Sequence, residues 1–133
     1  MELAWGELDV EEIPGEADNP KIVSWHETTL GGGDVDEVSW CSSFVNAMIT
    51  RSGLVGTDSK AARSWLRWGT SCAPVMGCVC VLWRVRIEAW QGHVGFWVAE
   101  AGDSVYLLGG NQSNRVRVSR YPKDRVLDYR SPA

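Results

Sequence analysis

Two hydrophobic patterns follow one another along this chain of 133 residues, and their order limits the folds open to it. Apolar residues recur at helical spacing within residues 41–69, whereas from 77 to 129 they alternate with polar ones. A period near 3.6 is typical of helices, and a period of two is typical of strands. Helical segments come first and strands follow without helices between them, so parallel βαβ units are not expected. The sequence therefore predicts an α+β fold in which helices pack on an antiparallel sheet.

The first strongly helical segment begins at Cys41. Its predicted buried face follows the spacing i, i+3, i+4, i+7 and i+8, which is occupied by Cys41, Phe44, Val45, Met48 and Ile49. Gly53 is expected to end this helix, because glycine adopts the left-handed backbone that often follows a helix. A second helix is predicted with Thr57 or Asp58 as N-cap, Gly69 at its end and an apolar face of Ala62, Trp65 and Leu66.

The alternating part of the chain predicts about five strands. They are expected at residues 77–87, 92–100, 104–109, 115–120 and 125–129. Turn-forming residues separate them at Gln91-Gly92, at Ala101-Gly102-Asp103 and from Asn111 to Asn114. Short turns favour antiparallel pairing of consecutive strands.

Residues 1–133 are predicted to form a single domain with three parts. These are an acidic N-terminal wrap over 1–36, a helical part over 37–70 and an antiparallel sheet over 77–130. A chain of this length can bury a core without disulfides or metal ions. Its four cysteines, Cys41, Cys72, Cys78 and Cys80, are too unevenly spaced for a disulfide framework, although a Cys72–Cys78 bridge stays open.

The charges are divided unevenly along the chain. Residues 1–40 hold eleven acids and one lysine, whereas residues 41–133 hold twelve bases and six acids. We expect the acidic segment to dock on the basic body, and the absence of a nucleic-acid motif argues against a nucleic-acid partner. No apolar run is long enough for a membrane span, and the start MELAWGELDVEE lacks the features of a signal peptide. We therefore expect no membrane insertion and synthesis in the cytoplasm.

Three residues carry the candidate chemistry: Cys41 at a helix start, His93 in GHVGFW and Asn111 in LLGGNQ. A free thiol has a pKa of about 8.5, so a nucleophilic cysteine needs a helix N-terminus or a neighbouring imidazole to form the thiolate. His93 and Asn111 lie on consecutive strands of a predicted hairpin, which would bring them together. The pattern indicates a cysteine hydrolase in which His93 is the base and Asn111 orients its ring, with Gln112 as the rival for that third role.

The sequence blocks WCSSFVN, GTDSKAARSWLRWG, GHVGFW, LLGGNQSNRV and YRSP occur in this order over nearly the whole chain. In this combination the chain resembles the papain-like cysteine peptidoglycan hydrolases of the CHAP and NlpC-like superfamily, and most closely the small endolysin-type proteins of phages and prophages. The resemblance implies a catalytic domain with Cys41 as nucleophile, His93 as general base and Asn111 as the orienting residue, without a separate wall-binding domain. Bacterial peptidoglycan is the implied partner, and a monomer is expected.

The substrate groove and any metal site are less well specified by sequence. Trp40 beside the nucleophile, Trp97 on the histidine strand and Gln112 are predicted to contact substrate, and the other tryptophans to fill the core. No cofactor or metal is predicted. Asp34, Asp36 and Glu37 are similar to the calcium loop of some CHAP proteins, but their spacing differs, so helix capping and solvation are expected instead. His26 has no motif partner and is expected to be structural.

The expected activity is endolysin-like hydrolysis of an amide bond in the stem peptide or cross-link, through an acyl-enzyme. The basic balance of residues 41–133 favours a carboxylate-rich stem peptide, and hence peptide-bond cleavage over N-acetylmuramoyl-L-alanine amidase action. A structural or wall-binding phage module of the same fold, or an acyltransferase, are the alternatives. Bacteriolytic action on the wall is expected after release through a holin pore or delivery by a phage particle.

Overall fold

The computed structural model describes residues 2–8, 10, 20–26, 40–89, 91–112 and 115–132, without the side chains of Glu2, Val23, Ser24, His26 and Asn111. The helices in these ranges are α1 (Glu2–Trp5), α2 (Pro20–His26) and α3 (Cys41–Arg51), with short 3-10 helices η1 (Ala62–Arg67) and η2 (Lys123–Arg125). The strands are β1 (Thr70–Ser71), β2 (Val79–Trp83), β3 (Gly92–Ala101), β4 (Ser104–Gln112), β5 (Arg115–Pro122) and β6 (Val126–Ser131). Most of the predicted acidic wrap, with Asp34, Asp36 and Glu37, lies outside the described residues.

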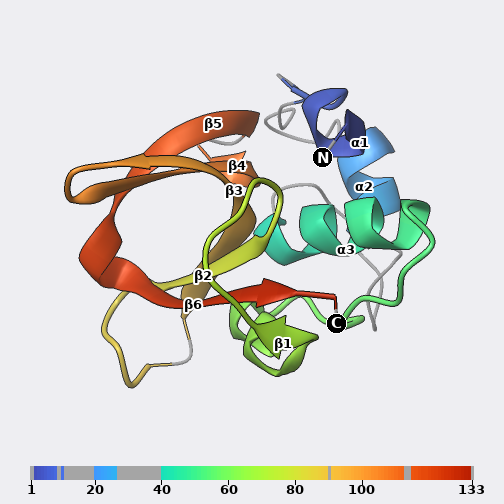
Figure 1. Cartoon of the computed structure of the whole chain (residues 1–133). Coiled ribbons are helices and arrows are strands. Elements are labelled where there is room, and N and C mark those ends of the chain that lie inside the picture. The colour runs from blue at the N-terminus through green and yellow to red at the C-terminus, as the bar shows by residue number, and fades with distance from the viewer. Residues whose placement is uncertain are drawn as a thin grey trace.

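The helix α3 begins at Cys41 as the spacing predicts, and residues 41–49 are all buried. Burial extends all round the helix because α2 packs on one side of it while β3 and β4 lie on the other (Figure 1). The chain leaves the helix through Gly53, whose φ of 90° is the left-handed backbone expected at this position. The nucleophile candidate is thus held at the end of a fully packed element.

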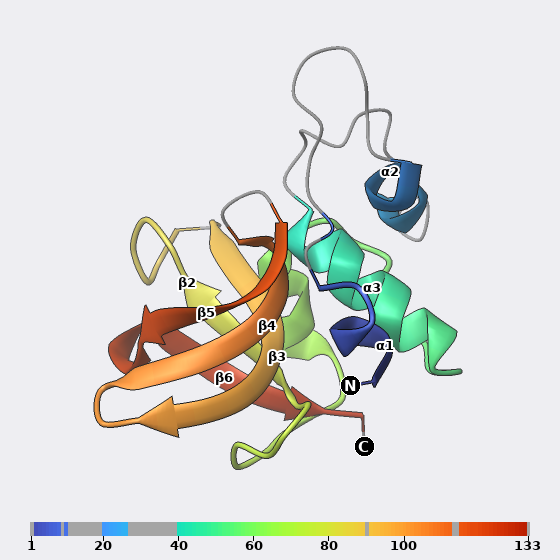
Figure 2. The same ribbon diagram turned by 90° about the horizontal axis from the view of Figure 1, so that it is seen from above.

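The six strands form one antiparallel sheet in the order β1-β6-β2-β3-β4-β5. Only the three residues of η2 join β5 to β6, although these strands lie far apart in the sheet order. The sheet must therefore curl strongly, and Figure 2 shows it as an open barrel with α3 outside. We call the side that packs on α3 the helix side and the other the inner side.

Each side of the sheet has its own apolar core. On the helix side, Val81, Val94, Phe96 and Leu108 pack with Phe44 and the fully buried Trp25, Trp40 and Trp65. On the inner side, Cys80, Leu82, Val105 and Leu107 pack with Trp97, Tyr121 and Tyr129. Burial of large aromatic side chains on the helix side fixes where α3 sits against β3 and β4.

Two predicted elements differ from those observed. The strand expected over 77–87 ends at Trp83, and Val85 and Ile87 are exposed in the loop that follows. The helix expected after Thr57 is a 3-10 helix that begins only at Ala62, and Asp58 takes a positive φ of 56° instead of capping it. The reason is a competing contact: the Asn46 side chain of α3 holds the segment before η1 in an extended form.

Asn46 is a buried polar residue whose amide ties this segment to the nucleophile helix. Its Oδ1 accepts the backbone N–H groups of Thr57 and Asp58, at 2.8 and 3.1 Å. Its Nδ2 donates to the Ser59 carbonyl at 3.0 Å and to the Ser42 carbonyl at 3.2 Å. Because buried amides need partners for both ends, Asn46 sets the path of the chain toward residues 60–62.

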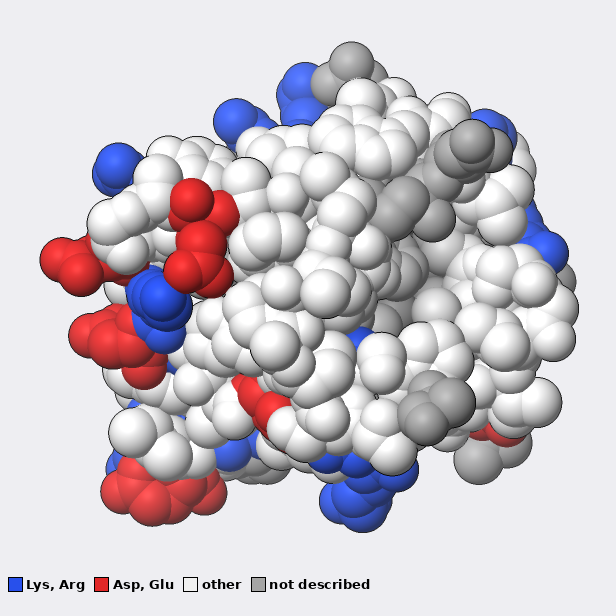
Figure 3. Space-filling view, in the orientation of Figure 1, with Lys and Arg blue, Asp and Glu red and all other residues white. Residues whose placement is uncertain are grey.

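Few charges are paired across elements in the described part of the chain. Glu7, after α1, accepts hydrogen bonds from Lys21 of α2 and Arg51 of α3, which docks one acidic residue of the N-terminal segment on the body. Other acidic side chains gather where the β3–β4 turn and η2 lie (Figure 3), and there Lys123 pairs with Glu100. Within the ranges described, no helix is long and apolar enough to cross a bilayer.

We predict that Asn46→Ala lowers the free energy of unfolding by about 2–4 kcal/mol, since each buried group left without its partner costs roughly 1–3 kcal/mol. Urea denaturation measures the change. Thr50→Ala, an exposed position on the same helix, is the matched control and should stay within about 0.5 kcal/mol of the parent. Equal effects of the two changes would contradict a structural role for the Asn46 amide.

Candidate active site

The structure brings Cys41 and His93 together at one end of the sheet. Cys41 is the first residue of α3, and His93 is the second residue of β3, a strand on which α3 packs. Both side chains are buried, with only 4% of Cys41 exposed, and the Cys41 sulfur hydrogen-bonds the His93 ring. The pairing predicted from sequence is therefore present as a direct contact.

The environment of His93 favours its charged form. Burial alone would lower the pKa of the imidazole, but the hydrogen bond with Cys41, the negative charge of its thiolate and a further hydrogen bond that the ring donates to Gln112 raise it above the ordinary value. A shift in this direction stabilises the thiolate and imidazolium as a pair. It is the form in which a cysteine is ready to attack.

Gln112 fixes which ring nitrogen of His93 carries the proton. The Gln112 Nε2 donates both its hydrogens to backbone carbonyls, to Leu107 at 3.0 Å and to Arg117 at 2.6 Å. Its Oε1 is therefore the atom that lies 2.8 Å from His93 Nε2, and it accepts the proton on that nitrogen. The other nitrogen, Nδ1, is left to exchange a proton with the thiol.

A β-bulge in β4 places Gln112 in this position. The pairing of β4 with β5 shifts register between Gly109 and Gln112, so the side chains do not simply alternate over this stretch. A Cβ on Gly109 would lie 2.6 Å from Gln112 Oε1, and one on Gly110 would lie 2.7 Å from both Phe44 and Trp40. The two adjacent glycines thus make room for the Gln112 amide on the inner side and for α3 on the helix side. A bulge commonly redirects a side chain in this way.

Gln112 makes the contact with the His93 ring that was predicted for Asn111. Regular alternation from Gly109 would put residue 111 on the face of the histidine, and the bulge puts Gln112 there instead. The Asn111 side chain itself lies outside the part of the chain that is described. Gln112 is 3% exposed and bonded through both atoms of its amide, and its contact with substrate stays a prediction.

Tyr121 completes the surroundings of the imidazole and was not anticipated from sequence. Its hydroxyl lies 3.2 Å from His93 Nε2, and its ring lies beside the imidazole with centroids 5.2 Å apart. Burial, and then the charge of the Cys41 thiolate, raise the pKa of this phenol, so it stays neutral. The signal in the sequence was weak, because Tyr121 is a single aromatic residue on a strand with three other partly exposed positions.

A cavity of about 140 Å³ opens onto Cys41. Its walls come from the segment before and at the start of η1, from the loop after β2 and from the start of β3; they are Lys60, Ala61, Ala62, Arg84, Gln91 and Gly92. Among the described residues, two cations line it and no carboxylate does. A substrate reaching the sulfur would enter here.

Arg63 holds one wall of this cavity in place. From η1, its guanidinium donates to three backbone carbonyls of the loop between β2 and β3, those of Gln91 at 2.9 Å, Ile87 at 2.6 Å and Arg86 at 2.9 Å. A planar fork of five donors suits this bracing, which a lysine would not reproduce. The loop that carries Arg84 is therefore tied to the helical part.

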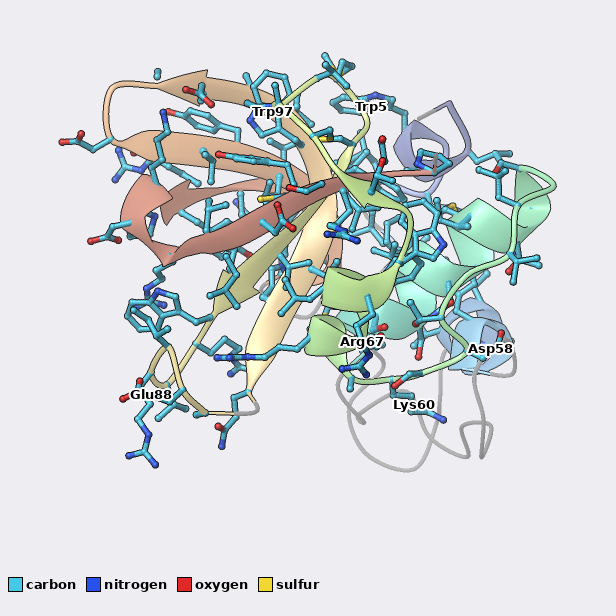
Figure 4. All side chains as sticks on the ribbon, turned by 60° about the horizontal axis from the view of Figure 1, so that its bottom comes forward. Trp5, Asp58, Lys60, Arg67, Glu88 and Trp97 are labelled. Atoms are coloured by element: carbon cyan, nitrogen blue, oxygen red, sulfur yellow. The ribbon has the colours of Figure 1, made fainter. Side chains whose placement is uncertain are left out.

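The two tryptophans predicted to contact substrate do not line the cavity. Trp40 is fully buried in the helix-side core, where it packs against Trp25, and its contact with substrate stays a prediction. Trp97 lies in the inner-side core, and Figure 4 shows it well apart from Lys60 at the cavity. Both behave as core residues because their large apolar rings stabilise the two faces of the sheet.

The other cysteines lack an environment for nucleophilic chemistry. Burial raises the pKa of Cys78 and of Cys80 above the ordinary thiol value, so both stay protonated. Cys72 hydrogen-bonds Cys78, and none of the four cysteines forms a disulfide. Among the described residues, no group of three or more His, Cys, Asp or Glu is placed to hold a metal ion, and the candidate calcium residues Asp34, Asp36 and Glu37 lie outside that set.

A scan against protein-family models gave no match, and a search of curated proteins gave none either. Assignment of a chemistry to this site therefore depends on the residues and their geometry.

We predict that Gln112→Leu lowers kcat/KM by roughly 10- to 100-fold, the usual range for loss of a residue that orients a catalytic group. Gln112 raises the pKa of His93, so its loss should also move the alkaline limb of the pH profile, where the imidazolium loses its proton, to lower pH. Rates of thiol alkylation by iodoacetamide across pH give this limb without a substrate.

Tyr121→Phe is the matched control, since it keeps the ring beside the imidazole and removes only the longer contact. Its rate should fall by less than about tenfold, because the proton on Nε2 still has its acceptor. An unchanged alkaline limb in Gln112→Leu would rule out the orienting role.

Proposed function

We propose that this protein is a papain-like cysteine hydrolase that cleaves an amide bond in the peptide part of bacterial peptidoglycan. The observation that carries the proposal is the contact of Cys41, at the start of a buried helix, with a His93 ring whose far nitrogen is fixed by a side-chain amide. A thiol, an imidazole and an orienting amide in this sequence of contacts form the working unit of cysteine hydrolases. The cavity at Cys41 supplies a route for the substrate.

The chain's own residues account for each proton in such a reaction. His93 Nδ1 takes the proton of Cys41, and the sulfur attacks the carbonyl carbon of the scissile amide. The imidazolium then gives that proton to the leaving amine, which leaves an acyl-enzyme on Cys41. In the second half His93 Nδ1 takes a proton from water, the hydroxide attacks the acyl carbon, and the thiol is restored when the proton returns. His93 Nε2 stays bonded to Gln112 throughout.

The start of α3 supports the charge that develops on the substrate oxygen. Cys41 is the first residue of α3, and the N–H groups of a helix's first turn are directed toward the helix start, where they can donate to an anion. The backbone N–H of Cys41 is therefore the donor we assign to the oxyanion, with the helix dipole adding to it.

Peptidoglycan as substrate follows from the resemblance of the sequence blocks around Cys41, His93 and Gln112, and the cavity lining agrees with it. Stem peptides carry free carboxylates, and the described lining of the cavity presents the positive charges of Lys60 and Arg84 without a negative one. Cleavage within the stem or cross-link fits this better than cleavage at the neutral sugar junction. Mass spectrometry of the released fragments separates the two, since amidase action would leave glycan with bare lactyl groups.

We predict that Cys41→Ala abolishes the clearing of purified peptidoglycan, with a loss of roughly 10³-fold or more, and that His93→Ala is about as damaging because the two residues act as one unit. Turbidity of a wall suspension measures the rate, and circular dichroism checks the fold. Cys72→Ser is the matched control: it removes a partly exposed thiol away from the cavity and should keep full activity.

Clearing by Cys41→Ala at the parent rate would overturn the mechanism. If an added amine appears in the product, the acyl group has been transferred to that amine and not to water. That outcome would reassign the protein as an acyltransferase. Absence of any clearing by the parent protein, with a Cys41 thiol that reacts no faster than Cys72, would favour a binding module of the same fold.

A further inference from the structure

Arg84 is the cation at the active-site cavity that has no role in holding the fold. It follows directly after β2, is exposed, and lines the same cavity as Cys41. Within the part of the chain that is described, no ion pair or hydrogen bond uses its guanidinium. By contrast Arg63 and Arg130 spend their guanidinium groups on backbone carbonyls.

Among the described residues, no acidic side chain compensates the charge of Arg84 at the cavity. The described lining includes Lys60 as a second cation and no acid. Glu88 belongs to the same loop as Arg84, but Figure 4 shows it at the outer end of that loop, pointing away from Lys60. An uncompensated guanidinium beside a nucleophile is suited to a bidentate bond with a carboxylate of the substrate.

We propose that Arg84 is a specificity residue that binds a free carboxylate of the substrate next to the scissile amide. The inference rests on the proposed function and narrows it to stem peptides whose carboxylate is free, as opposed to those in which it is a carboxamide. The loop that carries Arg84 is braced by Arg63, so the guanidinium is presented from a fixed base. A carboxylate held there would orient the peptide with its amide over the Cys41 sulfur.

Binding of a carboxylate at Arg84 also acts on the catalytic pair. The positive charge of Arg84 lowers the pKa of His93, against the larger effects that raise it. A bound carboxylate cancels this charge and thereby favours the imidazolium that must protonate the leaving amine. Removing the charge by mutation should likewise raise the pKa of His93. Arg84→Gln should therefore move the alkaline limb of iodoacetamide reactivity to higher pH.

The test compares two forms of one substrate. Purified peptidoglycan is used as prepared and after its stem carboxylates have been converted to carboxamides with a carbodiimide and ammonia. The parent protein should cleave the carboxylate form at least about tenfold faster, since a paired charge is among the stronger polar contacts. Arg84→Gln should lose this preference by slowing on the carboxylate form alone, and Arg84→Lys should retain part of it. Arg86→Gln, an exposed arginine two residues away that does not line the cavity, should behave as the parent.

A binding measurement separates this inference from the proposed function. Soluble stem peptides in both forms are titrated calorimetrically into Cys41→Ala, with and without Arg84→Gln. Tighter binding of the carboxylate form that disappears with Arg84→Gln supports the assignment, whatever the rate of turnover. Equal binding of both forms, or a preference that survives Arg84→Gln, overturns it even if the walls are cleared. Failure to clear walls of either form would count against the proposed function and leave the binding result to decide on Arg84.

Discussion

The hydrogen bond between Gln112 and His93 is the contact on which the chemistry of this site depends. Both N–H groups of the Gln112 amide are committed to backbone carbonyls of β4 and β5, so its oxygen is the only atom it can present to the ring. The tautomer of His93 is thereby set by the sheet's own main chain and not by solvent. Adjacent glycines at 109 and 110 allow this arrangement, because one leaves room for the amide and the other for the nucleophile helix.

The cavity is held by two polar side chains outside the catalytic group. Asn46 binds the segment that leads to Lys60, and Arg63 binds the loop after Arg84. One comes from the nucleophile helix and the other from η1, so one wall is tied to α3 and the other to η1. Preorganisation of this kind is what allows weak groups to act together on one bond.

The sequence predicted the α+β class, the helix starting at Cys41 and the hairpin carrying His93. Each of these depends on the spacing of apolar and turn-forming residues within a short segment. For the third residue of the site it preferred Asn111 and left Gln112 as the rival. Strict alternation assigns Asn111 to the histidine face, and the spacing of the sequence does not reveal the bulge between Gly109 and Gln112 that puts Gln112 there. Likewise, Trp40 and Trp97 could be assigned to the two cores only once both faces of the curled sheet were known. The predicted start of the second helix was wrong because the Asn46 amide, distant in sequence, binds the backbone N–H of Thr57.

The central claim is that Cys41 and His93 titrate as one unit, and nitrogen NMR of the imidazoles tests it most directly. The chain has two histidines, so His26→Gln identifies the His93 signals. The account predicts a His93 pKa above the ordinary 6.5, a neutral form protonated at Nε2, and a fall in that pKa in Cys41→Ala, where burial is no longer opposed by the thiolate. A His93 pKa that is the same with and without the thiol, or a neutral form protonated at Nδ1, would contradict it.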